Sequence, residues 1–355
     1  MICVTIARTT NSSMAKAMVA AIHGGADLLE LRLDHLHEPP DWSVLLADRC
    51  RPVMATCRRP CDGGHFAGEE RARMGLLTAA MAAGVDWVDV EDDACAALPA
   101  AGRARRLVSH HDLDGTPADL SARVGAMAQL GADAIKVVTQ ARALMDNLTL
   151  LRLCAAAPIP TIAFCMGPGG LASRLLAGRH GAPWTYAAPD DGPIPAAGQP
   201  RLATLIHTYG YAGIGPATKL FAVAGAPIAH SLSPHAHNAA FVAANMDCRY
   251  LPLQVVPEDL HNLLPFAEAL GIGGVSITLP HKRAVMPYLD DYDTTVARVG
   301  ACNTVRQGDT GWRGTNTDLP AAMLTIRRLL GLSPSAPLDG RRALVLGAGG
   351  VARTV

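Results

Sequence analysis

Short apolar runs alternate along the first part of the chain with longer stretches in which apolar positions recur every three or four residues. The short runs have the length and β-branched content of buried strands, and the longer stretches are typical of amphipathic helices. Eight strands are predicted, at residues 2–7, 28–34, 53–58, 87–91, 107–111, 134–139, 161–166 and 185–187. Helices are predicted between them, at residues 13–23, 71–83, 118–130, 143–155 and 171–176. Over about 210 residues this alternation predicts a (β/α)8 barrel, with a doubly wound open sheet as the alternative.

A second α/β region follows a glycine-rich and poorly periodic stretch, YGYAGIGP at residues 209–216. Its strands are predicted at residues 220–224, 249–254, 274–279 and 302–306. Its helices are predicted at residues 235–244, 257–270 and 319–330. After a proline-rich turn, residues 342–346 predict one more strand that leads directly into Gly347.

The composition narrows the class of protein and of partner. Half of the 355 residues are apolar and 17% are charged, which excludes an intrinsically disordered chain. The 31 basic residues equal the 31 acidic residues, so no charge excess points to nucleic acid or to an anionic membrane. A small metabolite is the expected partner, and the oligomeric state is left open.

The cysteine and histidine patterns indicate the compartment. Nine cysteines contain no C-x-x-C pair, and the thirteen histidines contain no H-E-x-x-H motif. We therefore expect reduced thiols and no metal site. With no secretory signal and no apolar run long enough to span a bilayer, a cytoplasmic location is expected.

Charged residues interrupt several of the predicted barrel strands near their carboxyl ends. They are Glu30, Arg32, Arg58, His111 and Lys136. An unpaired charge buried in a strand costs several kcal/mol, so charged residues at these positions are expected to have partners or a function. Because the carboxyl ends of barrel strands meet at one mouth, these five residues predict an active site there.

Lys136 indicates the type of chemistry. It lies between Ile135 and Val137, and partial desolvation there favours the neutral amine needed for a Schiff base with a ketone. His111 is suited to proton transfer near neutral pH, although the adjacent His110 leaves the choice between the two open. Arg174 and the strand arginines fit a carboxylate and hydroxyls through their fork geometry. A Schiff-base enzyme acting on a keto acid fits these residues, and so does a class I aldolase.

Six motifs in the first part occur in a recognisable order: ELRLD, TCRRPCDGG, SHHD, AIKVVTQ, GPGGLASRLLAG and AAGQPRL. In this order they resemble the type I 3-dehydroquinate dehydratases, over about residues 1–208. The resemblance implies a (β/α)8 barrel that removes water from 3-dehydroquinate by syn elimination, giving 3-dehydroshikimate without a cofactor.

The resemblance also implies residue roles. Lys136 would form the imine, and His111 would act as general base and acid. The implied substrate-binding residues are Thr5, Glu30, Arg32, Arg58, Asp62, Arg174 and Gln199. Two positions depart from the family pattern, because Asp62 replaces the usual glutamate and Pro195 replaces a small hydroxyl residue.

The second region carries four more motifs: FAVAGAPIAHSLSPHAHNAAF, GGVSITLPHK, CNTV and GTNTD. Ser231 and Ser233 could direct two hydroxyls at one carboxylate, or could simply cap a helix. Together the motifs resemble shikimate dehydrogenase, over about residues 219–355. The resemblance implies that the two serines bind the substrate carboxylate and that NADP is the cofactor. It implies Thr278, Lys282, Asn303 and Asp318 as partners of the substrate hydroxyls, with Lys282 and Asp318 as the catalytic acid–base pair.

The last residues carry a dinucleotide fingerprint of the form G-x-G-x-x-A. It implies the cofactor-binding residues Gly347, Ala348, Gly349, Gly350 and Val351. Because a complete βαβ unit takes roughly 30 residues, we expect the chain to stop within this domain. The expected organisation is a barrel at 1–208, a linker at 209–218, a substrate-binding α/β domain at 219–338 and the start of a Rossmann-type domain at 339–355.

The order of the two resemblances is that of the bifunctional 3-dehydroquinate dehydratase/shikimate dehydrogenase family of aromatic amino-acid biosynthesis. We expect a working dehydratase and a dehydrogenase half that is inactive without the rest of its cofactor domain. The alternatives are a dehydratase joined to a non-catalytic shikimate-binding module, a pathway sensor without turnover, and another Schiff-base lyase or aldolase.

Overall fold

A computed structural model describes residues 1–47, 49–99, 102–342 and 344–345 of the chain. The chain divides into two compact units, Met1–Thr218 and Lys219–Val355, and each is considered by itself. Residues 209–218, expected as a linker, are grouped with the first unit, in which Tyr211 is buried.

The first unit is built on eight strands that pair in parallel, in the order β7-β6-β5-β4-β3-β2-β1-β8. Their bounds are β1 Ile2–Ile6, β2 Leu28–Arg32, β3 Val53–Thr56, β4 Trp87–Glu91, β5 Arg105–Asp112, β6 Ala134–Gln140, β7 Thr161–Met166 and β8 Thr185–Ala187. Each strand neighbours the next one in sequence, and β8 returns to β1. A doubly wound sheet reverses its order in the middle, so this order confirms the barrel.

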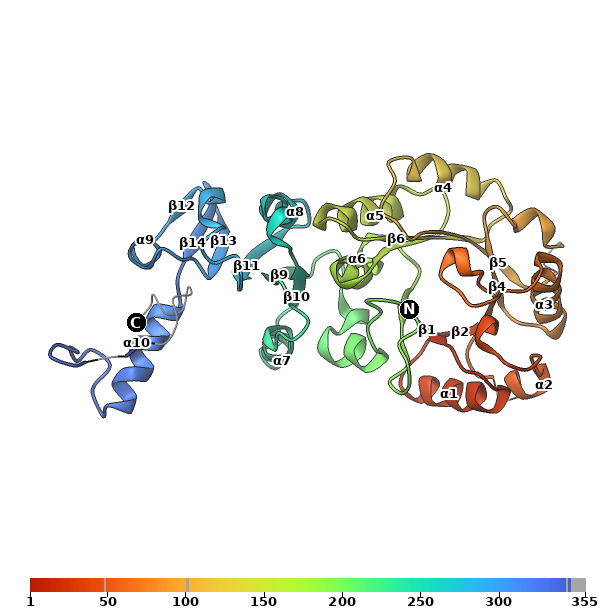
Figure 1. Ribbon diagram of the computed structural model, residues 1–355, viewed down its shortest axis with the longest axis horizontal. Helices are drawn as coiled ribbons and strands as arrows, with labels where there is room; N and C mark the ends of the chain where they lie inside the picture. The colour runs from red at the N-terminus through yellow and green to blue at the C-terminus, as the bar shows by residue number, and fades with distance from the viewer. Residues whose placement is uncertain (48, 100–101, 343, 346–355) are drawn as a thin grey trace. The chain divides into compact units, whose positions relative to one another are not determined.

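Helices surround the strands of the first unit (Figure 1). They are α1 Asn11–His23, α2 Trp42–Leu45, α3 Glu70–Ala83, α4 Leu120–Ala128, α5 Leu144–Ala156 and α6 Leu171–Leu176. Local sequence sets their ends: α1 begins after Thr10, whose hydroxyl accepts a hydrogen bond from the Ser13 backbone, and α3 ends at Gly84 in a left-handed conformation.

Two successive layers of side chains fill the barrel interior. The apolar layer contains Cys3, Leu28, Met54, Trp87, Leu107, Ala134 and Ile162, all buried. Two residues further along six of these strands, and therefore on the same face, lie Thr5, Glu30, Thr56, Asp89, Ser109 and Lys136. The apolar layer thus supports a polar layer on the carboxyl-terminal side, where barrel active sites form.

The second unit contains a six-stranded sheet in the order β10-β9-β11-β13-β14-β12. Its strands are β9 Lys219–Gly225, β10 Cys248–Gln254, β11 Ile272–Ile277, β12 Asp291–Tyr292, β13 Thr304–Gly308 and β14 Gly311–Thr315. Its helices are α7 Ser233–Ala243, α8 Leu263–Ala269, α9 Thr294–Val299 and α10 Asp318–Leu329. Helices α7 and α8 flank the sheet (Figure 1). Strands β12 and β14 and helix α9 were not predicted, and residues 257–262 of the predicted helix 257–270 form a 3₁₀ helix instead.

The prediction for the end of the chain can be compared with the structure at only a few residues. Of the predicted strand at 342–346, residues 342, 344 and 345 lie in no strand, and the other two lie outside the described residues. The implied cofactor-binding residues 347–351 also lie outside them. Within the described ranges no helix combines the length and apolarity required to cross a membrane.

Candidate active sites

A cavity of about 320 Å³ opens at the carboxyl ends of the barrel strands. All nine residues singled out from the sequence of the first part line it: Thr5, Glu30, Arg32, Arg58, Asp62, His111, Lys136, Arg174 and Gln199. The structure therefore brings together side chains from positions 5 to 199 of the sequence, as the strand-end argument requires.

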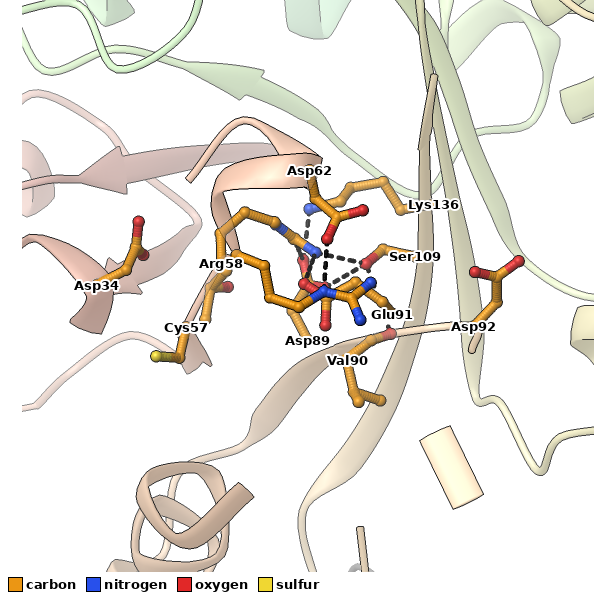
Figure 2. Close-up of polar contacts among 12 residues, drawn as sticks. Asp34, Cys57, Arg58, Asp62, Asp89, Val90, Glu91, Asp92, Ser109 and Lys136 are labelled. Atoms are coloured by element: carbon orange, nitrogen blue, oxygen red, sulfur yellow. Dashed lines mark hydrogen bonds and ion pairs between the residues drawn. The ribbon is translucent and has the colours of Figure 1, made fainter. Parts of the chain in front are cut away.

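Asp89 is the centre of the charged network on the cavity floor. Its carboxylate accepts hydrogen bonds from the Lys136 ammonium, from the Arg58 guanidinium at 2.7 Å and from the Ser109 hydroxyl at 2.6 Å. Figure 2 shows these groups converging on it from neighbouring strands. Burial opposes ionisation of Asp89, but the positive charges of Arg58 and Lys136 outweigh it and hold the pKa well below its usual range. Asp89 is thus a buried anion that fixes two cations.

Glu91 supplies the second negative charge beneath the cavity. It accepts from Arg58 at 2.8 Å and also pairs with Arg73, which is fully buried. Sequence reasoning missed both Asp89 and Glu91, because the run WVDVE was treated only as a strand. The reasoning that selected Glu30 would have found them, since both are carboxylates inside a predicted barrel strand.

The Lys136 ammonium also lies 3.7 Å from Glu30 and 5.1 Å from the centre of the Tyr186 ring. Glu30 is held by the Thr5 hydroxyl, which donates at 2.7 Å, and Thr5 in turn accepts from Gln199 at 3.1 Å. Gln199 follows β8, so this chain of hydrogen bonds ties the loop above the cavity to its floor.

The structure distinguishes the two adjacent histidines. His110 lies with its Nδ1 3.7 Å from Asp92 and does not line the cavity, whereas His111 does. The Nδ1 of His111 is buried and has no hydrogen-bond partner in the described part of the chain. Burial and the positive charges of Arg58 and Lys136 lower its pKa well below the usual value. His111 is therefore a neutral base facing the cavity.

Arg174 differs from the other arginines of the cavity. It is 1% exposed, its guanidinium lies 4.1 Å from the centre of the Phe164 ring, and no ion pair joins it to a carboxylate of any described residue. Burial lowers its pKa to about 9. An unpaired cation in a cavity wall is costly, and an anion beside it would offset that cost.

Arg32 and Asp62, in contrast, are already paired. Arg32 donates two hydrogen bonds to Asp34, at 2.9 and 2.7 Å, and Asp62 accepts from Arg59 at 2.7 Å. Pro195, the second departure from the family pattern, lines the same cavity. The departures noted in the sequence therefore fall on the cavity wall.

The second unit has a cavity of about 370 Å³, lined by four of the residues predicted for it: Ser231, Ser233, Thr278 and Asn303. The other two adjoin it, since Lys282 donates to Asp318 at 2.6 Å and the Asn303 amide donates to the same carboxylate at 2.9 Å. All six predicted residues therefore form one cluster, in which the Asp318 carboxylate pairs with the Lys282 amine.

Family profiles match both parts of the chain. Residues 2–216 match type I 3-dehydroquinase, and residues 223–305 match the shikimate dehydrogenase substrate binding domain. The chloroplastic bifunctional 3-dehydroquinate dehydratase/shikimate dehydrogenase of Arabidopsis thaliana is 31% identical over 379 residues. The match covers 100% of this chain and 62% of the Arabidopsis protein, so the chain spans less than two thirds of that relative.

Shorter relatives match one part each. A 3-dehydroquinate dehydratase of Dehalococcoides mccartyi is 42% identical, covering 52% of this chain and 86% of that protein. A shikimate dehydrogenase (NADP(+)) of Gloeothece citriformis is 41% identical, covering 39% of this chain and 46% of that protein. Among solved structures, dehydroquinate dehydratase and shikimate dehydrogenase from S. pombe is 27% identical with a TM-score of 0.52, covering 99% of this chain and 71% of that one.

Proposed function

Because the chain belongs to the type I 3-dehydroquinase family, we propose that its first unit converts 3-dehydroquinate into 3-dehydroshikimate and water. The observation that carries the proposal is the meeting of Lys136, neutral His111 and unpaired Arg174 in one cavity. These groups supply an amine, a base and a carboxylate partner, which are the three functions that this elimination needs.

The reaction begins at Lys136. After the ammonium gives up a proton, its nitrogen attacks the substrate ketone. The carbonyl oxygen takes up that proton and a second one from the nitrogen and leaves as water, so a cationic imine remains. The imine withdraws electrons from the neighbouring carbon, so His111 can remove a proton there. The resulting enamine expels the adjacent hydroxyl, which takes the proton from His111 and leaves as water. Hydrolysis of the imine then releases the product and restores the Lys136 amine.

The remaining cavity residues position the substrate. Arg174 pairs with the substrate carboxylate and thereby gains the anion that it lacks. Glu30, Arg32, Arg58, Asp62 and Gln199 are assigned to the hydroxyls, and Thr5 holds Glu30 in place. Asp89 keeps Lys136 and Arg58 at the cavity floor.

Borohydride trapping tests the proposal. Reduction in the presence of 3-dehydroquinate should add the mass of the bound ligand to the Lys136 peptide. The chain contains four lysines, so Lys16, Lys219 and Lys282 serve as internal controls in the same digest. Full dehydratase turnover with no label on Lys136 would refute the Schiff base. A cleaved carbon–carbon bond among the products would identify an aldolase, and stoichiometric binding without turnover would identify a sensor.

We further propose that the second unit binds 3-dehydroshikimate and shikimate. Ser231 and Ser233 bind the carboxylate, Thr278 and Asn303 the ring hydroxyls, and Lys282 with Asp318 transfers the proton at the reacting oxygen. NADP, when bound, supplies or accepts the hydride, and the residues assigned to it are 347–351. The location proposed is the cytoplasm, supported by nine free cysteines.

Shikimate binding tests this second assignment separately from the first. Calorimetry should detect one shikimate site that Lys282→Ala weakens and Lys136→Ala leaves unchanged. NADP-dependent shikimate oxidation then distinguishes a dehydrogenase from a binding module. Binding that is insensitive to Lys282→Ala would contradict the assignment.

A further inference from the structure

A second group of metal-ligating side chains lies behind the Arg32 wall of the barrel cavity. Asp34 and His35 belong to the 3₁₀ turn that follows β2, and His65 lies in the loop that follows β3. One ligand atom from each of the three lies within 4.8 Å of the other two. The Nε2 of His35 and the Nδ1 of His65 are each 3.8 Å from Oδ2 of Asp34. The three side chains therefore present two imidazoles and a carboxylate to a common point.

The imidazole of His35 lacks a partner for this nitrogen. Its Nε2 is buried and makes no hydrogen bond to the part of the chain that the structure describes. A buried imidazole nitrogen without a hydrogen-bond partner is a position at which histidine can bind a metal ion.

Asp34 is fixed in the orientation that a ligand needs. Arg32 donates to both of its oxygens, and the His65 backbone N–H donates to Oδ2 at 3.0 Å. Oδ2 accepts two of these three hydrogen bonds and Oδ1 accepts one, so of the about four positions of an ionised carboxylate the free one lies on Oδ1. The arginine thus acts as the outer partner that orients a metal-binding carboxylate.

The loop that carries His65 is also held in place. The Phe66 N–H donates to the Arg58 carbonyl at 3.0 Å, and a Cβ on Gly64 would lie 2.2 Å from that same carbonyl oxygen. The backbone on both sides of His65 is therefore fixed, while its side chain is 63% exposed and lies with its ring centre 4.2 Å from that of His35.

We propose that Asp34, His35 and His65 bind a divalent zinc-type ion. Imidazole and carboxylate ligands suit zinc, and three protein ligands leave a position for water. Metal bonds of about 2.1 Å in a tetrahedral arrangement place ligand atoms about 3.4 Å apart, so the three ligand atoms, which lie within 4.8 Å of one another, must move closer together when the ion binds. The adjoining cavity of about 550 Å³, which His37 and Glu38 also line, has room for the water. Sequence spacing could not reveal this site, because its ligands are thirty residues apart.

Zinc titration of the metal-free full chain tests the proposal. Calorimetry should show one tight site per chain, and Co²⁺ should give the visible absorption of a complex with nitrogen ligands. His65→Ala and His35→Ala should each weaken zinc binding at least about tenfold and remove the cobalt absorption. His23→Ala, which changes an exposed histidine at the end of α1, is the matched control and should bind as the unchanged chain does.

His65 is the decisive position, because its exposed side chain can be removed without threatening the fold. Zinc affinity unchanged in His65→Ala would overturn the proposal, since the ion would then be bound elsewhere. An equal loss in His23→Ala would also overturn it, because general surface binding would explain the titration. Neither result bears on the dehydratase assignment, for which Lys136 trapping is the test.

Discussion

At the scale of single residues, the buried arginines of the barrel divide by whether they have a counterion. Arg58 is paired with Asp89 and Glu91, and Arg73 is paired with Glu91. Arg174, equally buried, has a Phe164 ring in place of an anion. The paired arginines, Arg58 and Arg73, have their charge balanced in the absence of substrate. The charge of Arg174 is balanced only when an anion binds. Substitutions at the two kinds should therefore act in opposite directions on stability.

Asp89→Asn should lower the free energy of unfolding by about 3–5 kcal/mol, because it leaves Lys136 and Arg58 as buried charges without their shared partner. Urea unfolding measures the change. Asp93→Asn is the matched control, since Asp93 pairs with Arg59 at 2.9 Å but is 64% exposed. Such surface pairs contribute about 0–1 kcal/mol. Equal losses in the two variants would show that Asp89 is not the centre of a buried network.

Arg174→Met should raise the free energy of unfolding by about 1–2 kcal/mol, because it removes a buried cation that no anion offsets. The same change should raise KM for 3-dehydroquinate about tenfold or more, since it removes a charged hydrogen-bond partner. Arg179→Met is the control, and it should change the free energy of unfolding in the opposite direction. Arg179 donates to the carbonyls of Gly215 and Thr218, so its loss should destabilise the fold without affecting KM. A destabilised Arg174→Met would contradict this account of Arg174.

His111 should make stability depend on pH. Its folded pKa lies well below 6.5, so as the pH falls through 6.5 the unfolded chain takes up a proton that the folded chain refuses. The free energy of unfolding therefore falls with falling pH, by at most about 1.4 kcal/mol per pH unit from this group. His111→Gln should reduce this slope, whereas the exposed His23→Gln should retain it. Denaturant unfolding at pH 7.0, 6.0 and 5.5 measures both, and identical slopes would contradict the role of burial.

The residue scale also shows where the sequence was informative. Lysine, histidine and arginine at strand ends could be placed at the cavity, because strand direction alone decides where they meet. Their partners could not be assigned in this way. Nothing in the sequence states that Arg58 pairs with Asp89 and Glu91, or that Arg174 has no partner, because those pairings depend on neighbouring strand registers.

At the scale of elements, the site rests on a repeated arrangement of strand residues. In six of the strands the apolar residue lies two positions before the polar one, as Leu28 precedes Glu30 and Ala134 precedes Lys136. Strong alternation made the barrel strands predictable nearly to their ends. Strands β12 and β14 were missed because β12 has two residues, and β14 has glycine at two of its five positions. Short and glycine-containing strands are specified by their neighbours more than by their own pattern.

The loop after β8 should be sensitive to a single methyl group. Gly198 has φ +73°, and a Cβ there would lie 2.2 Å from the Gly167 carbonyl oxygen. Gly198→Ala should therefore displace the adjacent Gln199 and lower kcat/KM of the dehydratase about tenfold or more. Gly84→Ala is the control, because Gly84 also has a positive φ, at +92°, but faces open space. It should cost about 1 kcal/mol of stability and leave kcat/KM unchanged. Equal kcat/KM in the two variants would show that the Gly167 contact does not position Gln199.

At the scale of the whole molecule, each proposed reaction lies entirely within one compact unit. Every residue of the dehydratase cavity lies before position 200, and every residue assigned to the shikimate cavity in the second unit lies after position 230. Hydrogen bonds on either side of the boundary between the two units, which falls between Thr218 and Lys219, agree with its position. Arg179 donates to the Thr218 carbonyl at 2.6 Å, whereas the Lys219 N–H donates to the Asp247 backbone carbonyl. Two neighbouring residues thus belong to different cores.

Residues 1–218 expressed alone should therefore fold and dehydrate 3-dehydroquinate with the kcat/KM of the whole chain. Ending the segment at 218 retains the bonds of Arg179 to Gly215 and Thr218, so the last turn of the unit stays attached. Ending it at 208 removes those bonds and the buried Tyr211, and should lower the melting temperature clearly. Thermal unfolding and steady-state kinetics on the two segments compare the observed boundary with the predicted one. Equal stability would favour the barrel limit at 208, and loss of activity in 1–218 would show that the dehydratase needs the second unit.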